Sequence, residues 1–169
     1  MNRRDFLAGA LAFPYLPRSL APKLPSPLAR LGRIGIELYT VRRELAADPE
    51  RTLAGVAEIG YREVEFAGYP PGTPQQVRAM LDRHGLRAPA SHVDFQALRS
   101  NWDRTLEQAA IIGQRFVVVP SLPANERATL EGWKRVAAAF NQAGAAARTQ
   151  GLRFGYHNHD VEFPLLDGV

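Results

Sequence analysis

The arrangement of this chain depends on the stretch IGIELYTVR, residues 34–42. Its first part, Ile34 to Tyr39, alternates apolar and other residues, which predicts a β-strand. Doubly wound nucleotide-binding folds usually place a glycine-rich phosphate loop directly after the first strand. Glu37 to Arg42 occupies that position and contains no glycine. The first strand is therefore not expected to lead into a nucleotide-binding loop.

Strand and helix signals alternate through the rest of the sequence. Strands are expected at 62–66, 86–93, 115–119 and 152–157, and helices at 49–59, 74–84, 101–112 and 126–150. Asp48 and Thr73 are placed to cap two of these helices, and a glycine follows each helix. Strands separated by helices predict right-handed βαβ units and a parallel sheet. Without a phosphate loop, the expected fold class is α/β, a (β/α)8 TIM barrel represented by about its first five βα units.

Composition limits the partners of the folded part. Residues 1–30 hold five basic groups and one acid, whereas the remaining 139 residues carry 16 basic and 16 acidic side chains. A folded body without net charge argues against a nucleic-acid partner. No apolar run approaches the roughly 20 residues that span a bilayer, so stable membrane insertion is not expected. The chain has no cysteine, which excludes a disulfide framework, a thiolate metal site and a cysteine nucleophile.

The N-terminal segment reads as a targeting signal. Arg3 and Arg4 are followed by a mildly apolar run from Leu7 to Leu16, and the arginine pair resembles the twin-arginine export signal. Residues 17–30 carry four prolines and read as a linker. We therefore expect a signal peptide and linker at 1–30, a barrel portion at 31–169, and export to the periplasm or beyond by the twin-arginine route. The alternative is a disordered basic, proline-rich tail.

Polar residues recur at the carboxyl ends of the expected strands, where barrel active sites lie. The candidates are Glu37, Tyr39 and Arg42 after the first strand, Glu65 on the second, His92 on the third, and His157, His159 and Glu162 on or after the fifth. Glu37 and Tyr39 are expected to share one face of their strand. Structural alternatives remain open: Glu37 in a buried ion pair, Tyr39 in packing, and His92 as a hydrogen-bonded core histidine.

His157 and His159 stand two residues apart, close to Glu162. Alternate strand residues share a face, so both imidazoles can point toward one site. Two imidazoles with a neighbouring carboxylate are ligand types that suit a divalent metal ion. The alternative is a purely structural histidine pair.

The motifs at these positions resemble the sugar phosphate isomerase/epimerase family, the xylose-isomerase-like TIM barrels. The resemblance rests on GIELYTVR (35–42), IGYREVEFAGY (59–69), SHV (91–93), VVVP (117–120) and above all YHNHDVEF (156–163). The last string is typical of an exported branch with two histidines.

The resemblance implies a metal-dependent isomerase or epimerase that acts on a small-molecule sugar or sugar derivative by abstracting a proton next to a carbonyl. It implies one divalent ion (Mn, Mg, Co or Zn) bound through His157 and His159, with the remaining ligands outside this chain. By the same resemblance the catalytic residues are His92, Glu65 and Glu162, and the substrate-binding residues are Glu37, Tyr39, Arg42 and His159. His157 departs from the glutamate that many relatives carry there.

Two alternatives of function are kept. One is a lyase or hydrolase that cleaves keto-glycosides on the same fold, and the other is a non-catalytic carbohydrate-binding barrel. Because relatives close the barrel with strands six to eight, the sequence is expected to be a truncated product or fragment, inactive alone. Association of two half-barrels into a homo-oligomer would be another way to close the sheet.

Overall fold

The computed structural model describes residues 33–166, so the predicted export segment at 1–30 lies outside the described residues. The strands are β1 (Gly35–Glu37), β2 (Glu63–Phe66), β3 (Arg87–His92), β4 (Phe116–Val119) and β5 (Arg153–Tyr156). The helices are the 3-10 helix η2 (Leu38–Val41) and the α-helices α2 (Arg42–Ala47), α3 (Pro49–Ile59), α4 (Pro74–Arg83), α5 (Ala97–Ser100), α6 (Trp102–Ile112) and α7 (Leu130–Thr149).

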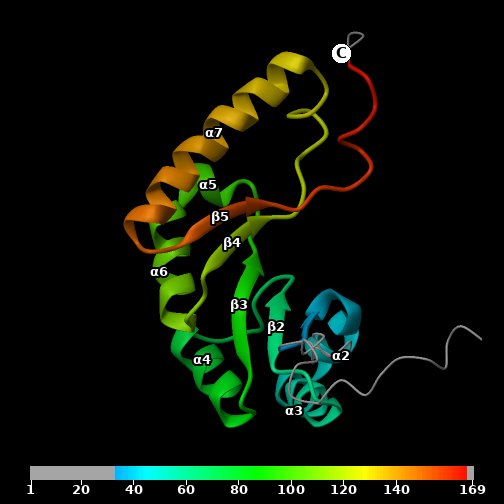
Figure 1. Ribbon diagram of the computed structural model, residues 1–169, viewed down its shortest axis with the longest axis vertical. Coiled ribbons are helices and arrows are strands. Elements are labelled where there is room, and N and C mark those ends of the chain that lie inside the picture. The colour runs from blue at the N-terminus through cyan, green and yellow to red at the C-terminus, as the bar shows by residue number, and fades with distance from the viewer. Residues whose placement is uncertain (1–32, 167–169) are drawn as a thin grey trace, which may run out of the picture. The chain divides into compact units, whose positions relative to one another are not determined.

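The strands form one parallel sheet whose order is that of the sequence, β1-β2-β3-β4-β5 (Figure 1). Sequential order is that of a barrel, whereas a doubly wound sheet reverses direction at a switch point. The predicted α/β class and the barrel arrangement of about five βα units are therefore confirmed.

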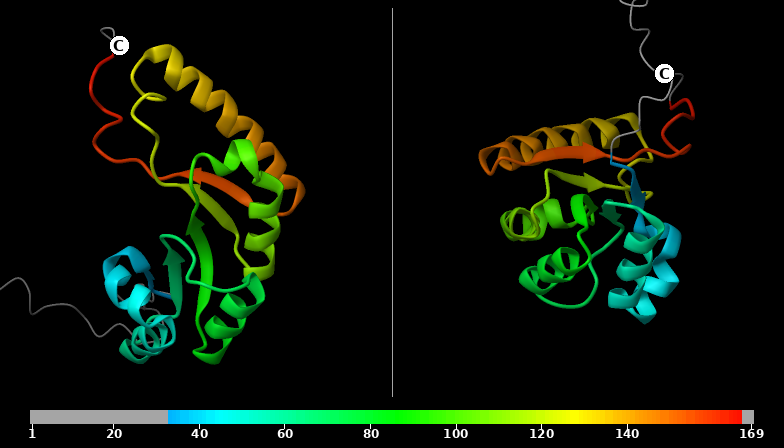
Figure 2. Two further views of the ribbon diagram at one scale, coloured as in Figure 1. Left: turned by 180° about the vertical axis from the view of Figure 1, so that it is seen from behind. Right: turned by 60° about the horizontal axis from the view of Figure 1, so that its bottom comes forward.

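The helices pack against one face of the sheet. Val64 and Phe66 of β2 and Val117 and Val119 of β4 are each at most 1% exposed and contact the helices. Figures 1 and 2 show α4, α6 and α7 along the same side of the strands. The intervening strand residues, among them Glu65, point to the opposite face, which these helices leave uncovered.

The helix boundaries follow their caps. The Asp48 carboxylate accepts from the Arg51 N–H at 3.0 Å, and Thr73 forms a capping box with Gln76. Gly60 ends α3 in the left-handed region that glycine favours. Within residues 33–166, no helix has both the length and the apolar character needed to cross a membrane.

The structure corrects the predicted elements in three places. The first strand ends at Glu37, because it pairs with β2 over only three residues, and the chain continues as η2. Tyr39 lies in η2 and therefore does not share a strand face with Glu37. The last helix begins at Leu130, four residues later than expected, because Thr129 caps it by accepting from the Gly132 N–H at 3.1 Å. The short helices α2 and α5 were not predicted.

An irregularity in β3 affects which face its side chains reach. Glu63 pairs with Arg87, but Glu65 pairs with Ala90, so three steps along β3 match two along β2. The extra residue is a β-bulge, which re-aims the side chains that follow it. Without it, His92 would point toward the helices; with it, His92 points to the same face as Glu65.

Candidate functional site

Four of the predicted site residues meet at the carboxyl ends of the strands. His92 lies at the centre: its Nδ1 is 3.5 Å from Glu37 Oε1 and its Nε2 is 3.5 Å from Glu65 Oε1. The His157 Nδ1 is 3.3 Å from the same Nε2, and the two rings meet edge to face at 5.1 Å. His92 is only 9% exposed, whereas both glutamate side chains are about one-third exposed.

Strand register explains this convergence. Glu37 pairs directly with Glu65, so the two carboxylates stand side by side. The bulge in β3 then brings His92 to their face. His157 follows the last residue of β5, and its backbone N–H still donates to the Val119 carbonyl at 3.0 Å, which extends the parallel pairing by one residue. Pro89 lies at the bulge. Proline inside a strand is typical of a bulge, so Pro89 was the feature of the sequence from which the bulge could have been predicted.

His159 and Glu162 lie beyond β5, in a loop. The His159 ring stacks on His157 with 4.7 Å between centroids. The Glu162 carboxylate accepts from the Tyr156 hydroxyl and, at 2.7 Å, from the His159 backbone N–H. Burial raises the pKa of Glu162, but the hydrogen bonds from Tyr156 and from the backbone, with a smaller contribution from His159, together hold the pKa below its usual value. In this structure the Glu162 carboxylate thus orders the loop that carries both histidines.

The contact with Glu162 also affects the Tyr156 hydroxyl. Burial, together with the hydrogen bond to the Glu162 carboxylate, raises the pKa of Tyr156 well above its usual value. The hydroxyl is therefore a persistent donor at neutral pH.

Tyr39 and Arg42 pair with each other. The Arg42 guanidinium lies 4.2 Å from the centre of the Tyr39 ring and donates to the Tyr39 carbonyl at 2.9 Å. Both residues line a cavity of about 400 Å³ that also includes Ala67 and Gly68. Within residues 33–166, no hydrogen bond or ion pair joins them to the cluster around His92, and their predicted role in substrate binding stays a prediction.

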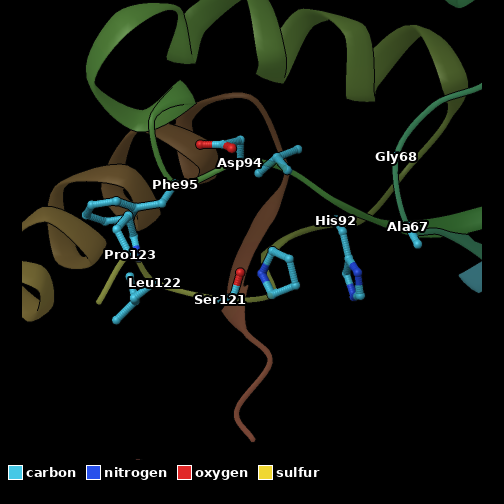
Figure 3. A pocket seen from close by; sticks show the side chains of 10 residues that line it. Ala67, Gly68, His92, Asp94, Phe95, Ser121, Leu122 and Pro123 are labelled. Carbon is cyan, nitrogen blue, oxygen red and sulfur yellow. The ribbon is translucent and has the colours of Figure 1, made fainter. Parts of the chain in front are cut away.

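A second cavity, of about 470 Å³, opens beside His92. Ala67 and Gly68 line it too, so the β2–α4 loop borders both cavities. In Figure 3 His92 lies near Ala67, across the cavity from Leu122 and Pro123. Ser121 and its neighbours were not predicted as site residues. They could have been predicted as site residues from their position, because they directly follow the fourth strand at the same edge of the sheet as the other candidates.

The cluster fits the expected metal ion only in part. Among residues 33–166, no group of three or more His, Asp or Glu side chains is arranged to hold a metal. The 3.3 Å between His92 Nε2 and His157 Nδ1 does match the separation of two ligands on a tetrahedral ion, about 3.4 Å for bonds of about 2.1 Å. The described residues fit part of a metal site and not a complete one.

Comparison with known proteins agrees with this fold. Residues 53–165 match the family described as the xylose isomerase-like TIM barrel. The chain belongs to this family. No match was found among the curated proteins.

Solved structures share the architecture. A sugar phosphate isomerase/epimerase from Parabacteroides distasonis ATCC 8503 is 27% identical, with a TM-score of 0.69 over 85% of this chain and 58% of that one. An AP endonuclease, family 2, from Brucella melitensis is 17% identical (TM-score 0.60, 75% of this chain, 55% of that one). An L-ribulose 3-epimerase is 21% identical (TM-score 0.53, 73% and 48%). The last two show the fold alone. The chain thus spans a little over half the length of the first of these structures.

Proposed function

We propose that the protein is a metal-dependent isomerase or epimerase that acts on a sugar or sugar derivative by removing a proton next to a carbonyl. The observation that carries this proposal is the placement of His92 between two carboxylates and a second imidazole. The sugar phosphate isomerase/epimerase with similar structure supports the substrate class. The activity is proposed for the protein at its full natural length.

The residues of this chain suit proton transfer. The Nδ1 of His92 lies 3.5 Å from Glu37 Oε1 and can pass a proton to that carboxylate, whereas Nε2, which lies 3.3 Å from His157 Nδ1, is the nitrogen that would face the ion. Such contacts are often long before substrate binds and shorten in the complex. The cavity beside His92 gives a small polar molecule access to the ring. Glu37 and Glu65, both partly exposed, are placed to accept hydrogen bonds from sugar hydroxyls.

His157 and His92 are the residues that would contribute ligands to a divalent ion, with His159 stacked behind His157. When bound, such an ion supplies Lewis-acid stabilisation of the negative charge that develops on the substrate. We also propose that the protein is exported by the twin-arginine route, on the strength of Arg3 and Arg4.

The test is exchange of the substrate α-proton in D₂O, followed by proton NMR with a panel of ketoses, aldoses and keto-glycosides. His92→Asn and Glu65→Gln are expected to lower the exchange rate by about 10²-fold or more. Glu63→Gln is the matched control, because Glu63 lies two residues before Glu65 on the same strand and makes no ion pair within the described part of the chain. Exchange that persists in His92→Asn would overturn the proposal.

The same spectra separate the alternatives. Release of an aglycone from a keto-glycoside identifies a lyase or hydrolase, and carbohydrate binding without exchange identifies a binding protein. Metal content, measured by elemental analysis after gel filtration, is expected to fall in His157→Ala and to stay unchanged in Glu63→Gln.

A further inference from the structure

A buried polar cluster lies directly behind the candidate site, on the helix-covered face of the sheet. The Tyr69 hydroxyl is 2.8 Å from Ser91 Oγ and 2.8 Å from Gln114 Oε1, and the Ser91 hydroxyl donates to the same Oε1 at 3.0 Å. Ser91 is fully buried and Gln114 is 6% exposed. The cluster joins three segments: the β2–α4 loop, β3 and the turn before β4.

One polar atom of this cluster has no hydrogen-bond partner. Within the described residues, the Gln114 side-chain nitrogen is buried without a hydrogen-bond partner. A buried donor left unpaired is costly, and native proteins keep few of them. Apolar residues of similar size would fill the same space at lower cost. The cluster thus combines three hydrogen bonds with one unpaired donor.

The position of the cluster indicates its role. Ser91 immediately precedes His92 in β3, and Tyr69 immediately follows Ala67 and Gly68, which border the cavity beside His92. Phe66, fully buried before this pair, contacts the Tyr69 ring edge to face at 5.7 Å. The two cavity-lining residues are thus held between two anchored aromatic rings, and Gly68 adopts a positive φ of 124° there.

We propose that Tyr69 is a positioning residue whose hydroxyl ties the β2–α4 loop to β3 next to His92, and so holds the wall of the cavity at a fixed distance from the imidazole. This inference rests on the proposed function. Tyr69 itself touches no reacting atom and acts through the loop and through Ser91. Small displacements of catalytic groups cost rate steeply, which is why such support matters.

The experiment is Tyr69→Phe in the full-length protein, which keeps the ring and removes only the hydroxyl. The matched control is Tyr61→Phe: Tyr61 also packs against the core, and within residues 33–166 its carbonyl, and not its hydroxyl, takes part in a side-chain hydrogen bond. Tyr69→Phe is expected to lower kcat about tenfold with little change in KM, because only the catalytic geometry is affected. Ser91→Ala removes the partner of the Tyr69 hydroxyl in the same hydrogen bond and is expected to lower kcat to a similar extent.

Hydrogen exchange supplies a readout that does not need turnover. Peptides containing Ala67 and Gly68 are expected to exchange faster in Tyr69→Phe than in Tyr61→Phe at temperatures where both variants are folded. Unchanged kcat together with unchanged loop exchange would overturn the inference, even if the melting temperature falls. If the wild-type protein exchanges no substrate proton, the proposed function fails, and loop exchange alone then decides the role of Tyr69.

Discussion

Replacement of Glu162 by glutamine should loosen the loop that carries His157 and His159. The carboxylate accepts from the Tyr156 hydroxyl and from the His159 backbone N–H at 2.7 Å. Glutamine can keep the first bond through its carbonyl oxygen, but its NH₂ group cannot accept the second. A hydrogen bond to a charged acceptor contributes about 1.5–3 kcal/mol when protected. Since Glu162 is only partly buried, we expect about 1.4 kcal/mol, which corresponds to about a tenfold change in the open population of the loop.

The assay is amide hydrogen exchange at His159, at neutral pH and well below the melting temperature. Exchange is expected to be about tenfold faster in Glu162→Gln than in the wild type. Asp160→Asn is the control, because it removes the same charge from the same loop while its side chain makes no hydrogen bond within the described residues. Equal exchange in the two variants would refute the reasoning. Faster exchange with unchanged catalysis would show that Glu162 orders the loop and takes no part in the reaction.

Three further predictions concern the scaffold. Hydrogen bonds from Arg83 lower the pKa of Glu50 from 4.5 to about 2, so this carboxylate stabilises the fold above its unfolded pKa and stops doing so as pH falls toward 2. Glu50→Gln should therefore reduce the slope of the free energy of unfolding against pH in this range. An unchanged slope would contradict this prediction. Phe66→Ala, at a fully buried site, should lower the free energy of unfolding by about 3–5 kcal/mol in urea titrations, and a loss below about 1 kcal/mol would be inconsistent with that packing. Gly113→Ala, at a φ of 86°, should destabilise the protein by more than about 1 kcal/mol, whereas Gly55→Ala, with open space around the new methyl group, should stabilise α3. A melting temperature that does not fall in Gly113→Ala, or that falls in Gly55→Ala, would contradict the corresponding prediction.

Much of the architecture was predictable because its signals are local. Helix α3 begins at Pro49 and ends at Ile59 as expected, since its cap, first-turn proline and terminal glycine act within a few residues of the backbone they affect. The placement of Glu37, Glu65 and His92 at the same edge of the sheet followed from the rule that parallel strands present their carboxyl ends at one edge. Their predicted chemical roles stay predictions.

Other features depend on contacts between distant segments. Tyr39 was expected beside Glu37, but the strand ends where its pairing with β2 ends, and the chain turns into η2. The cluster of Tyr69, Ser91 and Gln114 joins residues up to 45 positions apart, and no short pattern in the sequence marks it. Glu162 stood out by its proximity to the two histidines, yet only the folded loop shows that its carboxylate is engaged by Tyr156.

A barrel-type parallel sheet could be predicted from the stretch IGIELYTVR and from the glycine-terminated helices after it. The alternation of strand residues, the helix caps and the absence of a phosphate loop are all local signals, each contained in a few neighbouring residues. They were not sufficient to orient His92. Its side chain faces Glu37 and Glu65 because Ala90, and not Pro89, pairs with Glu65. Every second residue of a strand points the same way, so a shift of one residue turns a side chain to the opposite face. Which residue occupies that register depends on the pairing of β2 with β3, and that pairing exists only in the folded sheet.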